Sequence, residues 1–255
     1  MSILKSCYKE VCSVNSAEKL NQLIDEANKI VFFGGAGVST ESGVPDFRSE
    51  HGIYKKHLGA ESILTPMFMK RQPEEFWAFY RKFFMMENIK PNGAHYLLAE
   101  LEKEGKLLAV VTQNVDGLHQ EAGSKRVLEL HGNGGRFYCD SCYENYTMDE
   151  VREMDHEPKC KKCDGTVRPD IVLYQESLDG RVLEQSIQAI QQSDLLIVGG
   201  TSLTVYPAAG LIRYQRNGKL VIVNRDRTGS EGSADLVITE PIGQLFDEIL
   251  KLRQA

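Results

Sequence analysis

A short apolar run leads directly into a glycine-rich stretch near the start of the sequence. Residues 30–33, Ile-Val-Phe-Phe, are β-branched and aromatic, which is typical of a buried strand. Residues 34–48 follow as Gly-Gly-Ala-Gly-Val-Ser-Thr-Glu-Ser-Gly-Val-Pro-Asp-Phe-Arg. A strand that breaks into glycines leaves backbone N–H groups facing one place, and α/β folds hold a pyrophosphate in this way. The pattern therefore predicts a phosphate-binding loop at the end of a buried strand, although an ordinary glycine-rich connection is the alternative.

This stretch departs from the usual dinucleotide fingerprint. Gly35 and Gly37 occupy the first two glycine positions, but Thr40 stands at the third. No helix-strand unit follows to place a carboxylate on a ribose about 20 residues later. Instead, residues 46–48 offer a carboxylate, an aromatic face and a guanidinium. We therefore expect nucleotide binding, and a hydride-transferring dehydrogenase is disfavoured.

Composition excludes several classes of protein. The 255 residues are 42% hydrophobic and 26% charged, values that are typical of a globular chain with one large domain or one and a half. The net charge of −6 gives no general attraction to nucleic acid. No apolar run approaches the roughly 20 residues of a membrane span. Residues 1–15 lack the features of a secretory signal, so we expect a cytoplasmic protein with reduced thiols.

Strand-like and helix-like segments alternate along most of the chain, which predicts an α/β fold with a mostly parallel, Rossmann-type sheet covered on both faces. Two insertions interrupt it, a helical one and a cysteine-containing one. We predict a large domain from 15–46, 107–136 and 168–255, a small domain from 47–106 and 137–167, and a loose arm at 1–14. The expected strands are 30–33, 107–112, 127–130, 171–174, 194–200, 219–224 and 236–238, and the expected helices include 16–28, 182–191, 207–217 and 242–252.

Polar residues gather where the predicted strands end. Gln113, Asn114 and Asp116 follow the strand at 107–112, and His131 follows the strand at 127–130. Ligand-binding residues of open α/β sheets lie at such ends. Asn and Asp are also common turn formers, and a histidine there can be structural. A histidine at a strand end can equally act as a general base near neutral pH.

Four cysteines have the spacing of a metal site. Cys139 and Cys142 are separated by two residues, as are Cys160 and Cys163, and seventeen residues lie between the pairs. This spacing predicts a four-thiolate zinc site with no open coordination position, hence a structural rather than a catalytic ion. Unrelated buried or redox thiols are the alternative. Two further cysteines, Cys7 and Cys12, lie outside the pattern, and we expect them to be free thiols.

The motifs taken together resemble those of the sirtuins, NAD-dependent protein lysine deacylases. The resemblance covers about residues 30 to 240. It implies a Rossmann-type domain and a small helical and zinc-ribbon domain, with NAD and an acyl-lysine meeting in the cleft between them. The motifs are Gly35-Ala-Gly-Val-Ser39, Gly43-Val-Pro-Asp-Phe-Arg48, Thr112-Gln-Asn-Val-Asp116, His131-Gly132, the two cysteine pairs, Gly200-Thr-Ser-Leu203 and Asn224.

The resemblance also implies roles for individual residues. His131 would be the general base that takes a proton from a ribose hydroxyl, and Asn114 and Asp116 would orient the ribose and the nicotinamide amide. Phe47 would shield the nicotinamide site, and Arg48 would lie near the phosphates. The products would be free lysine, nicotinamide and an O-acyl-ADP-ribose. Further NAD contacts would come from Gly35, Ala36, Gly37, Thr40, Gln113, Val115, Gly200, Thr201, Ser202, Asn224 and Ile242, and the peptide would add as a strand beside Val172 and Leu173.

Two positions depart from the family pattern. Gln175 stands where many sirtuins have glycine, which places a side chain near the expected peptide groove. Members that remove acidic acyl groups resemble one another in a Tyr-x-x-Arg, whereas here Tyr80 is followed by Phe83. Without an arginine to pair a carboxylate, we expect a neutral acyl group such as acetyl. We also expect a monomer. Protein ADP-ribosyl transfer at the same site and a zinc-ribbon binding module with a vestigial nucleotide site are the competing hypotheses.

Overall fold

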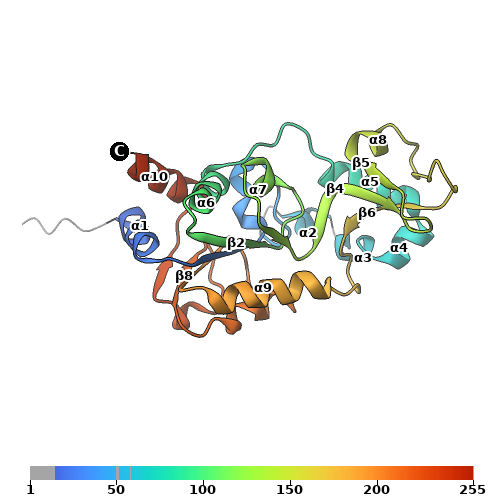
Figure 1. Ribbon diagram of the computed structural model, residues 1–255. Helices are drawn as coiled ribbons and strands as arrows, with labels where there is room; N and C mark the ends of the chain where they lie inside the picture. The colour runs from blue at the N-terminus through green and yellow to red at the C-terminus, as the bar shows by residue number, and fades with distance from the viewer. Residues whose placement is uncertain (1–14, 50–51, 58, 255) are drawn as a thin grey trace, which may run out of the picture.

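The computed structural model describes residues 15–49, 52–57 and 59–254 (Figure 1). The expected arm at 1–14, with Cys7 and Cys12, lies outside the described residues. The strands are β1 (Ile30–Gly34), β2 (Leu107–Thr112), β3 (Val127–Glu129), β4 (Gly132–Cys139), β5 (Asn145–Thr147), β6 (Val167–Ile171), β7 (Leu195–Gly199), β8 (Lys219–Val223) and β9 (Leu236–Ile238). The α-helices are α1 (Ser16–Glu26), α2 (Ile53–Lys56), α3 (Ala60–Ile63), α4 (Pro66–Arg71), α5 (Pro73–Phe84), α6 (Gly93–Lys103), α7 (Leu118–Glu121), α8 (Met148–Arg152), α9 (Gly180–Gln192) and α10 (Ile242–Gln254). The 3₁₀ helices are η1 (Ala36–Val38), η2 (Thr40–Ser42), η3 (Ala208–Tyr214) and η4 (Glu231–Ser233).

The large sheet is parallel and has six strands in the order β3-β2-β1-β7-β8-β9. The chain starts in the middle, builds outward through β2 and β3, and then returns to the other side of β1. The strand order therefore reverses between β1 and β7, which is where doubly wound sheets bind ligands. Every residue of β1 and β7 is buried, as expected for central strands with both faces covered. The predicted Rossmann-type fold class is confirmed.

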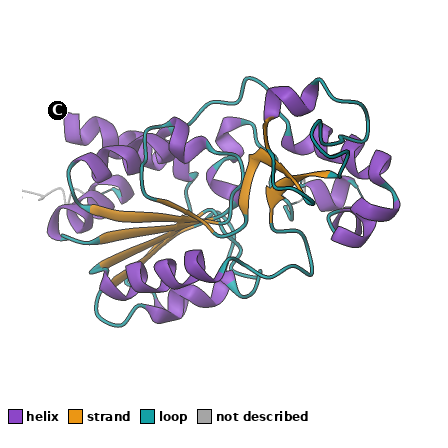
Figure 2. Cartoon of the chain, turned by 45° about the vertical axis from the view of Figure 1, so that its right-hand side comes forward, coloured by secondary structure: helices purple, strands orange, loops and turns teal. Residues whose placement is uncertain are grey.

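Helices cover both faces of this sheet (Figure 2). One face packs against α1, α6 and α10, with Leu20, Leu97 and Phe246 fully buried between helices and strands. The opposite face packs against α9 and η3, through Ile190 and Leu211 among others. Strands that end at one edge are thus held rigidly from both sides, and their following loops converge on a single site.

Helix α6 packs against the large sheet, although the predicted boundary at 106 assigned it to the small domain. Its Leu97, Leu98 and Leu101 are fully buried in the same core as α1 and α10. The apolar period of a helix shows that one face is buried but not which neighbour covers it. The division into two domains stays a prediction, and this packing argues for ending the helical insertion before Asn92, the N-cap of α6.

A smaller antiparallel sheet, in the order β5-β4-β6, stands beside the large one. Helix α5 packs on it through an aromatic cluster in which Trp77 and Tyr80 each lie 6.0 Å from Phe137, measured between ring centroids. All three side chains are fully or almost fully buried, as are Phe76 and Phe79, so the aromatic face of α5 is mainly core. The four cysteines lie in the turns at the end of this sheet.

Two predicted elements were wrong in detail. The strand expected at 171–174 is instead β6, which ends at Ile171 and pairs with β4 in the small sheet. The expected helix at 207–217 is the shorter 3₁₀ helix η3. Periodicity cannot separate a β-rich run in a strand from the same run in an extended loop, and residues 172–174 are such a loop. Within the described residues, none of the helices combines the length and the apolar character needed to cross a bilayer.

Candidate active site

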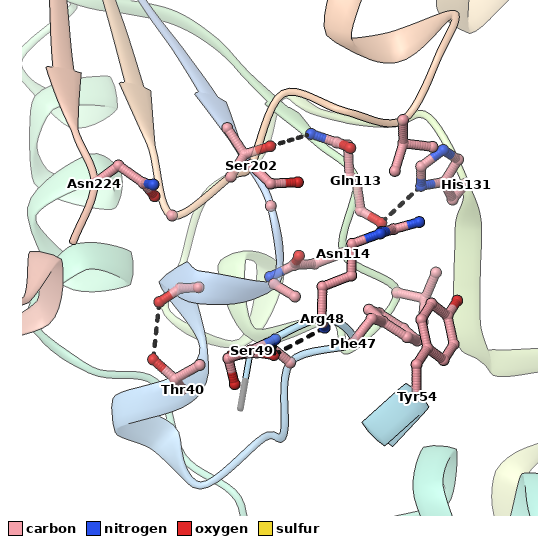
Figure 3. Close-up of a pocket in the computed structure, with 18 of the residues that line it drawn as sticks. Thr40, Phe47, Arg48, Ser49, Tyr54, Gln113, Asn114, His131, Ser202 and Asn224 are labelled. Atoms are coloured by element: carbon pink, nitrogen blue, oxygen red, sulfur yellow. Dashed lines mark hydrogen bonds between the residues drawn. The ribbon is translucent and has the colours of Figure 1, made fainter. Parts of the chain in front are cut away.

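A cavity of about 630 Å³ opens where β1, β2, β7 and β8 end (Figure 3). It is lined by residues from loops that are far apart in the sequence. Every predicted cofactor residue, both predicted peptide residues and two of the three predicted catalytic residues line it. These are Gly35, Ala36, Gly37, Thr40, Phe47, Arg48, Gln113, Asn114, Val115, His131, Val172, Leu173, Gly200, Thr201, Ser202, Asn224 and Ile242.

The glycines after β1 serve a different purpose from the one expected. The amides of Gly35 and Gly37 donate to the carbonyls of Gly199 and Gly200, at 3.3 and 2.8 Å. The amides of Val38 and Ser39 are bonded within the turn, so at most the Ala36 N–H is left for a ligand between 35 and 39. A Cβ on Gly37 would approach the backbone of Gly200 to 2.8 Å. The glycines thus allow the loops after β1 and β7 to pack closely. The prediction that these glycines leave several backbone N–H groups free for a phosphate was wrong.

Asp116 lies behind the cavity wall, at the centre of a buried polar network. The Ser39 hydroxyl donates to its carboxylate at 2.7 Å and accepts from the Asn114 side-chain amide at 3.0 Å. His95 is fully buried and accepts the Asn92 N–H at Nδ1, so its proton lies on Nε2, 3.4 Å from the same Ser39 oxygen. The Ser39 hydroxyl therefore donates one hydrogen bond and accepts two. The network fixes the side chains of Asn114 and Asp116 before any ligand arrives.

Burial sets the protonation of this network. Desolvation raises the pKa of Asp116, although hydrogen bonds from Ser39 and Asn114 act in the opposite direction. Burial also lowers the pKa of His95, to about 4, which keeps its ring neutral. Ser39 and His95 were not assigned roles from the sequence. The available signal was weak, since a histidine on a helix gives no indication of what its ring faces.

His131 is oriented by its backbone and by one ring nitrogen. Its Nδ1 lies 3.0 Å from the Gln113 carbonyl, which can only accept, so Nδ1 carries the proton and Nε2 is a free base. Its own carbonyl accepts the Val172 amide at 2.9 Å. Gly132 follows at φ +79°, and a Cβ there would lie 2.1 Å from the Asp170 carbonyl oxygen. The chain can therefore turn from β3 into β4 at this point only with glycine.

The environment lowers the pKa of His131. Desolvation is the larger cause, and the hydrogen bond to the Gln113 carbonyl raises the pKa by a smaller amount. A neutral imidazole at physiological pH is the state required of a general base.

The loop after η2 brings aromatic side chains to the cavity. Asp46 Oδ1 accepts the amides of Arg48 and Ser49, which closes a turn. This turn directs Phe47 toward Tyr54 (Figure 3), with their ring centroids 5.4 Å apart. The ring centroid of Phe84 lies 6.2 Å from that of Phe47. The Arg48 guanidinium lies 5.4 Å from the centre of the Tyr54 ring. Tyr54 and Phe84 both line the cavity and were not predicted as site residues.

The segment from Val172 to Glu176 is held as a tight loop. Arg168 forms two hydrogen bonds of 2.8 Å with the Glu176 carboxylate, which also accepts the Leu173 amide at 2.8 Å. Gln175 has φ +76°, a backbone conformation that favours glycine, and its exposed side chain lines the cavity. The position where many sirtuins have glycine is thus one where the backbone itself favours glycine.

The four cysteine sulfurs come from two turns of the same geometry. In each turn the first cysteine's amide donates to the carbonyl five residues later, Cys139 to Glu144 and Cys160 to Gly165. The residue after the second cysteine has a positive φ in both, +60° at Tyr143 and +59° at Asp164. All four sulfurs lie within 4.8 Å of one another. Sulfurs around a tetrahedral zinc lie about 3.8 Å apart, so the thiol set and its geometry fit a zinc ion.

The fold and the cavity define the class of this protein. A parallel sheet with a reversed strand order, a cavity at its carboxyl edge and an inserted four-cysteine module describe a dinucleotide-binding α/β protein. The chain belongs to the Sir2 family, whose sequence pattern matches residues 35–207. The resemblance to the sirtuins is thereby confirmed.

Individual relatives are similar over almost their whole length. The chain is 48% identical over 242 residues to the NAD-dependent protein deacetylase of Clostridium acetobutylicum, covering 93% of this chain and 99% of the relative. It is 51% identical over 237 residues to that of Clostridium perfringens, covering 91% and 97%. A Sir2 structure with a deacetylated p53 peptide and 3′-O-acetyl-ADP-ribose matches with a TM-score of 0.85 and 40% identity, covering 92% of this chain and 97% of that one. Sir2Tm bound to a propionylated peptide matches with a TM-score of 0.84 and 38% identity, covering 94% and 99%.

Proposed function

We propose that this protein removes the acetyl group from lysine side chains of proteins, consuming NAD and producing nicotinamide and O-acetyl-ADP-ribose. The observation that carries the proposal is the free Nε2 of His131 in a cavity lined by all the expected dinucleotide residues. Family membership and the deacetylase names of the relatives support it. The 3′-O-acetyl-ADP-ribose in a similar Sir2 structure favours deacetylation over ADP-ribosyl transfer.

The residues that line the cavity fit a dinucleotide. The loops after β1, β7 and β8 would hold its phosphates and adenosine, through Gly35–Gly37, Gly200–Ser202 and Asn224, with Thr40, Arg48, Gln113, Val115 and Ile242 completing the contacts. NAD supplies a bond between nicotinamide and ribose whose cleavage leaves an electrophilic carbon for the amide oxygen of the acetyl-lysine. Asn114 and Asp116 would orient the ribose and the nicotinamide amide, because the Ser39 network already holds them in place.

His131 would take the proton of a ribose hydroxyl at Nε2. Its lowered pKa keeps that nitrogen unprotonated, and the Gln113 carbonyl fixes the ring so that Nδ1 cannot compete as the base. Phe47 and Tyr54 would exclude water, which would otherwise intercept the electrophilic carbon.

The peptide would lie beside Val172 and Leu173. The amides of residues 172, 173 and 174 already donate, to the His131 carbonyl, the Glu176 carboxylate and the Leu64 carbonyl. We therefore infer that a peptide strand would be received here through backbone carbonyls of the enzyme, such as that of Val172. Gln175 would contact residues that flank the acetyl-lysine.

Cys139, Cys142, Cys160 and Cys163 would hold a structural zinc ion that cross-links the end of the small sheet. A set of four thiolates leaves no position for a reacting water. Tyr80 donates its hydroxyl to the Gly134 carbonyl at 3.0 Å, and its i+3 neighbour is Phe83, a neutral side chain at the position of the arginine in the Tyr-x-x-Arg pattern. A neutral acyl group remains the prediction. Monomeric state, cytoplasmic location and the absence of a nucleic-acid partner likewise stay predictions.

The test is product analysis by mass spectrometry with an acetyl-lysine peptide, with and without NAD. We expect equal amounts of deacetylated peptide, nicotinamide and acetyl-ADP-ribose, and no reaction without NAD. A peptide that keeps its acetyl group and gains ADP-ribose would replace the proposal with the transferase alternative. An unchanged peptide in the presence of NAD would contradict both.

A further inference from the structure

Two tyrosine hydroxyls meet on the wall of the cavity. The hydroxyl oxygens of Tyr54 and Tyr174 lie 2.5 Å apart and share a hydrogen bond, and both half-buried side chains line the cavity. Among residues 46–49, 52–57 and 172–176, which the structure describes, no other hydrogen bond joins the first two segments to the third. The pair therefore links the side of the cavity expected to hold NAD with the side expected to hold the peptide.

The Tyr174 end of this contact is held by the backbone around it. The Tyr174 amide donates to the Leu64 carbonyl at 2.9 Å. The neighbouring Leu173 amide donates to the Glu176 carboxylate, which also accepts two hydrogen bonds from Arg168. The loop is thus bonded on both sides of Tyr174, and the Tyr174 hydroxyl is a fixed point against which another segment can be positioned.

The Tyr54 end is connected to the residues expected to face the dinucleotide. The Tyr54 amide donates to the Phe47 carbonyl at 3.0 Å, and the two rings pack against each other (Figure 3). The Arg48 guanidinium lies 5.4 Å from the centre of the Tyr54 ring. The ion pair between Arg48 and Glu61, at 3.7 Å, joins two exposed side chains and contributes little. The positions of Phe47 and Arg48 therefore depend on where the Tyr54 ring lies.

Ligands on the two sides of the cavity would act on this series of contacts from opposite ends. A bound peptide would hold the loop that carries Tyr174, and a bound dinucleotide would hold Phe47 and Arg48. We propose that Tyr174 is a positioning residue: its hydroxyl holds Tyr54, and through Tyr54 the dinucleotide-binding side chains, so that a bound peptide strengthens dinucleotide binding. Such coupling is reciprocal, so the dinucleotide strengthens peptide binding by the same factor. This inference rests on the proposed function.

The test measures the binding of ADP-ribose, which lacks the bond that the reaction breaks, with and without an acetyl-lysine peptide. In the unchanged protein we expect the peptide to lower the Kd of ADP-ribose about fivefold. In Tyr174→Phe, which removes only the hydroxyl, the peptide should lower this Kd by less than about twofold. Isothermal titration calorimetry gives both values.

Steady-state kinetics provide a second measurement. Tyr174→Phe should raise the KM for NAD about fivefold, because the lost hydrogen bond acts on binding. The kcat for deacetylation should not change, because His131 keeps its hydrogen bond to the Gln113 carbonyl.

Tyr54→Phe removes the same hydrogen bond from its other end and repeats the test if one variant does not fold. The double variant Tyr54→Phe/Tyr174→Phe should therefore bind ADP-ribose, with peptide present, no more weakly than either single variant. Tyr214→Phe is the matched control, since Tyr214 is 42% exposed and does not line the cavity. It should keep the peptide effect of the unchanged protein.

A full peptide effect in a folded Tyr174→Phe protein would overturn the inference. Losses in the two single variants that add together in the double variant would overturn it as well, since they would show that the hydroxyls act separately. If the unchanged protein bound no ADP-ribose or made no acetyl-ADP-ribose, the proposed function itself would fail, and the inference would fail with it. Measurements on the unchanged protein therefore distinguish the two failures.

Discussion

The sulfurs of the four-cysteine cluster come from two short turns, whereas the cavity residues follow the ends of many strands, spread between Gly35 and Ile242. Each cysteine turn carries its own hydrogen bonds, and the second repeats the first. The cavity has no such local unit: Gln113 is bonded to Thr201 at 3.0 Å and Ser39 to Asp116. A metal site can thus be encoded by local spacing, while a dinucleotide site of this type needs the whole sheet.

The largest effect is expected from Cys142→Ser. Loss of one thiolate should abolish tight zinc binding and unfold the small sheet, because metal binding and folding of such modules are coupled. Activity should be lost as well, since β4 begins next to His131. Metal analysis and urea unfolding followed by tryptophan fluorescence report on it, because Trp77, the sole tryptophan, packs in the small sheet's core.

Ser141→Ala is the matched control in the same turn and should keep both metal and activity. A folded, active, zinc-free Cys142→Ser protein would show that the small sheet does not need a zinc ion at the four cysteines to fold.

His131→Ala should have the next largest effect, confined to the cavity. Removing a general base lowers turnover by about 100- to 10,000-fold, whereas the fold should persist because Gly132 and β4 keep their pairing. The measurement is kcat for deacetylation together with the thermal unfolding midpoint. His156→Ala, at an exposed position of the cysteine module, should leave both unaltered. Near-normal turnover in His131→Ala would remove this residue as the base.

Acid should destabilise the part of the protein that contains the large sheet, through three buried histidines. His95, His119 and His131 all have a lowered pKa, chiefly from burial. Each unfolded histidine binds a proton near its ordinary value of about 6.5, so the stability they contribute is complete above that pH and is lost as pH falls toward the folded values. For His95 the loss approaches about 3 kcal/mol by the pH of its folded value.

Urea unfolding between about pH 8 and pH 5 measures this slope. The acid limb of kcat/KM should also lie below about pH 6.5, because His131 is the expected base and its pKa is lowered. A stability that is flat over this range would contradict the buried, neutral state of the three rings.

The smallest expected effect is that of Gln175→Gly. The φ of Gln175 is +76°, a conformation that costs an L-residue about 1 kcal/mol of folding free energy, and glycine would remove that cost. Gln175→Ala is the matched control, since it removes the amide but keeps the Cβ and the strain. Denaturant midpoints separate the two variants, and the KM for several acetylated peptides shows whether the Gln175 amide contributes to binding. Equal stability of the two variants would show that the loop is not strained there.

Many residues of the candidate site could be predicted from the sequence, because they come directly after β-rich runs. Gln113 and His131 were predicted site residues since they come directly after such runs, and both line the cavity. The same reasoning failed at residues 171–174, where a β-rich run forms a loop after Ile171. It also missed Ser39, His95 and Tyr54, whose positions depend on contacts with distant segments.

The sequence by itself determined the parallel α/β sheet, the family and the spacing of the four cysteines, because periodicity, glycines and short turns are properties of neighbouring residues. Tertiary structure alone decided that Gly35 and Gly37 allow close packing of two loops, that α6 covers the large sheet and that Ser39 holds Asp116. It alone also brought together two tyrosine hydroxyls on the cavity wall. Such contacts join residues far apart in the chain, and no local pattern of side chains specifies which distant partner a buried group will meet.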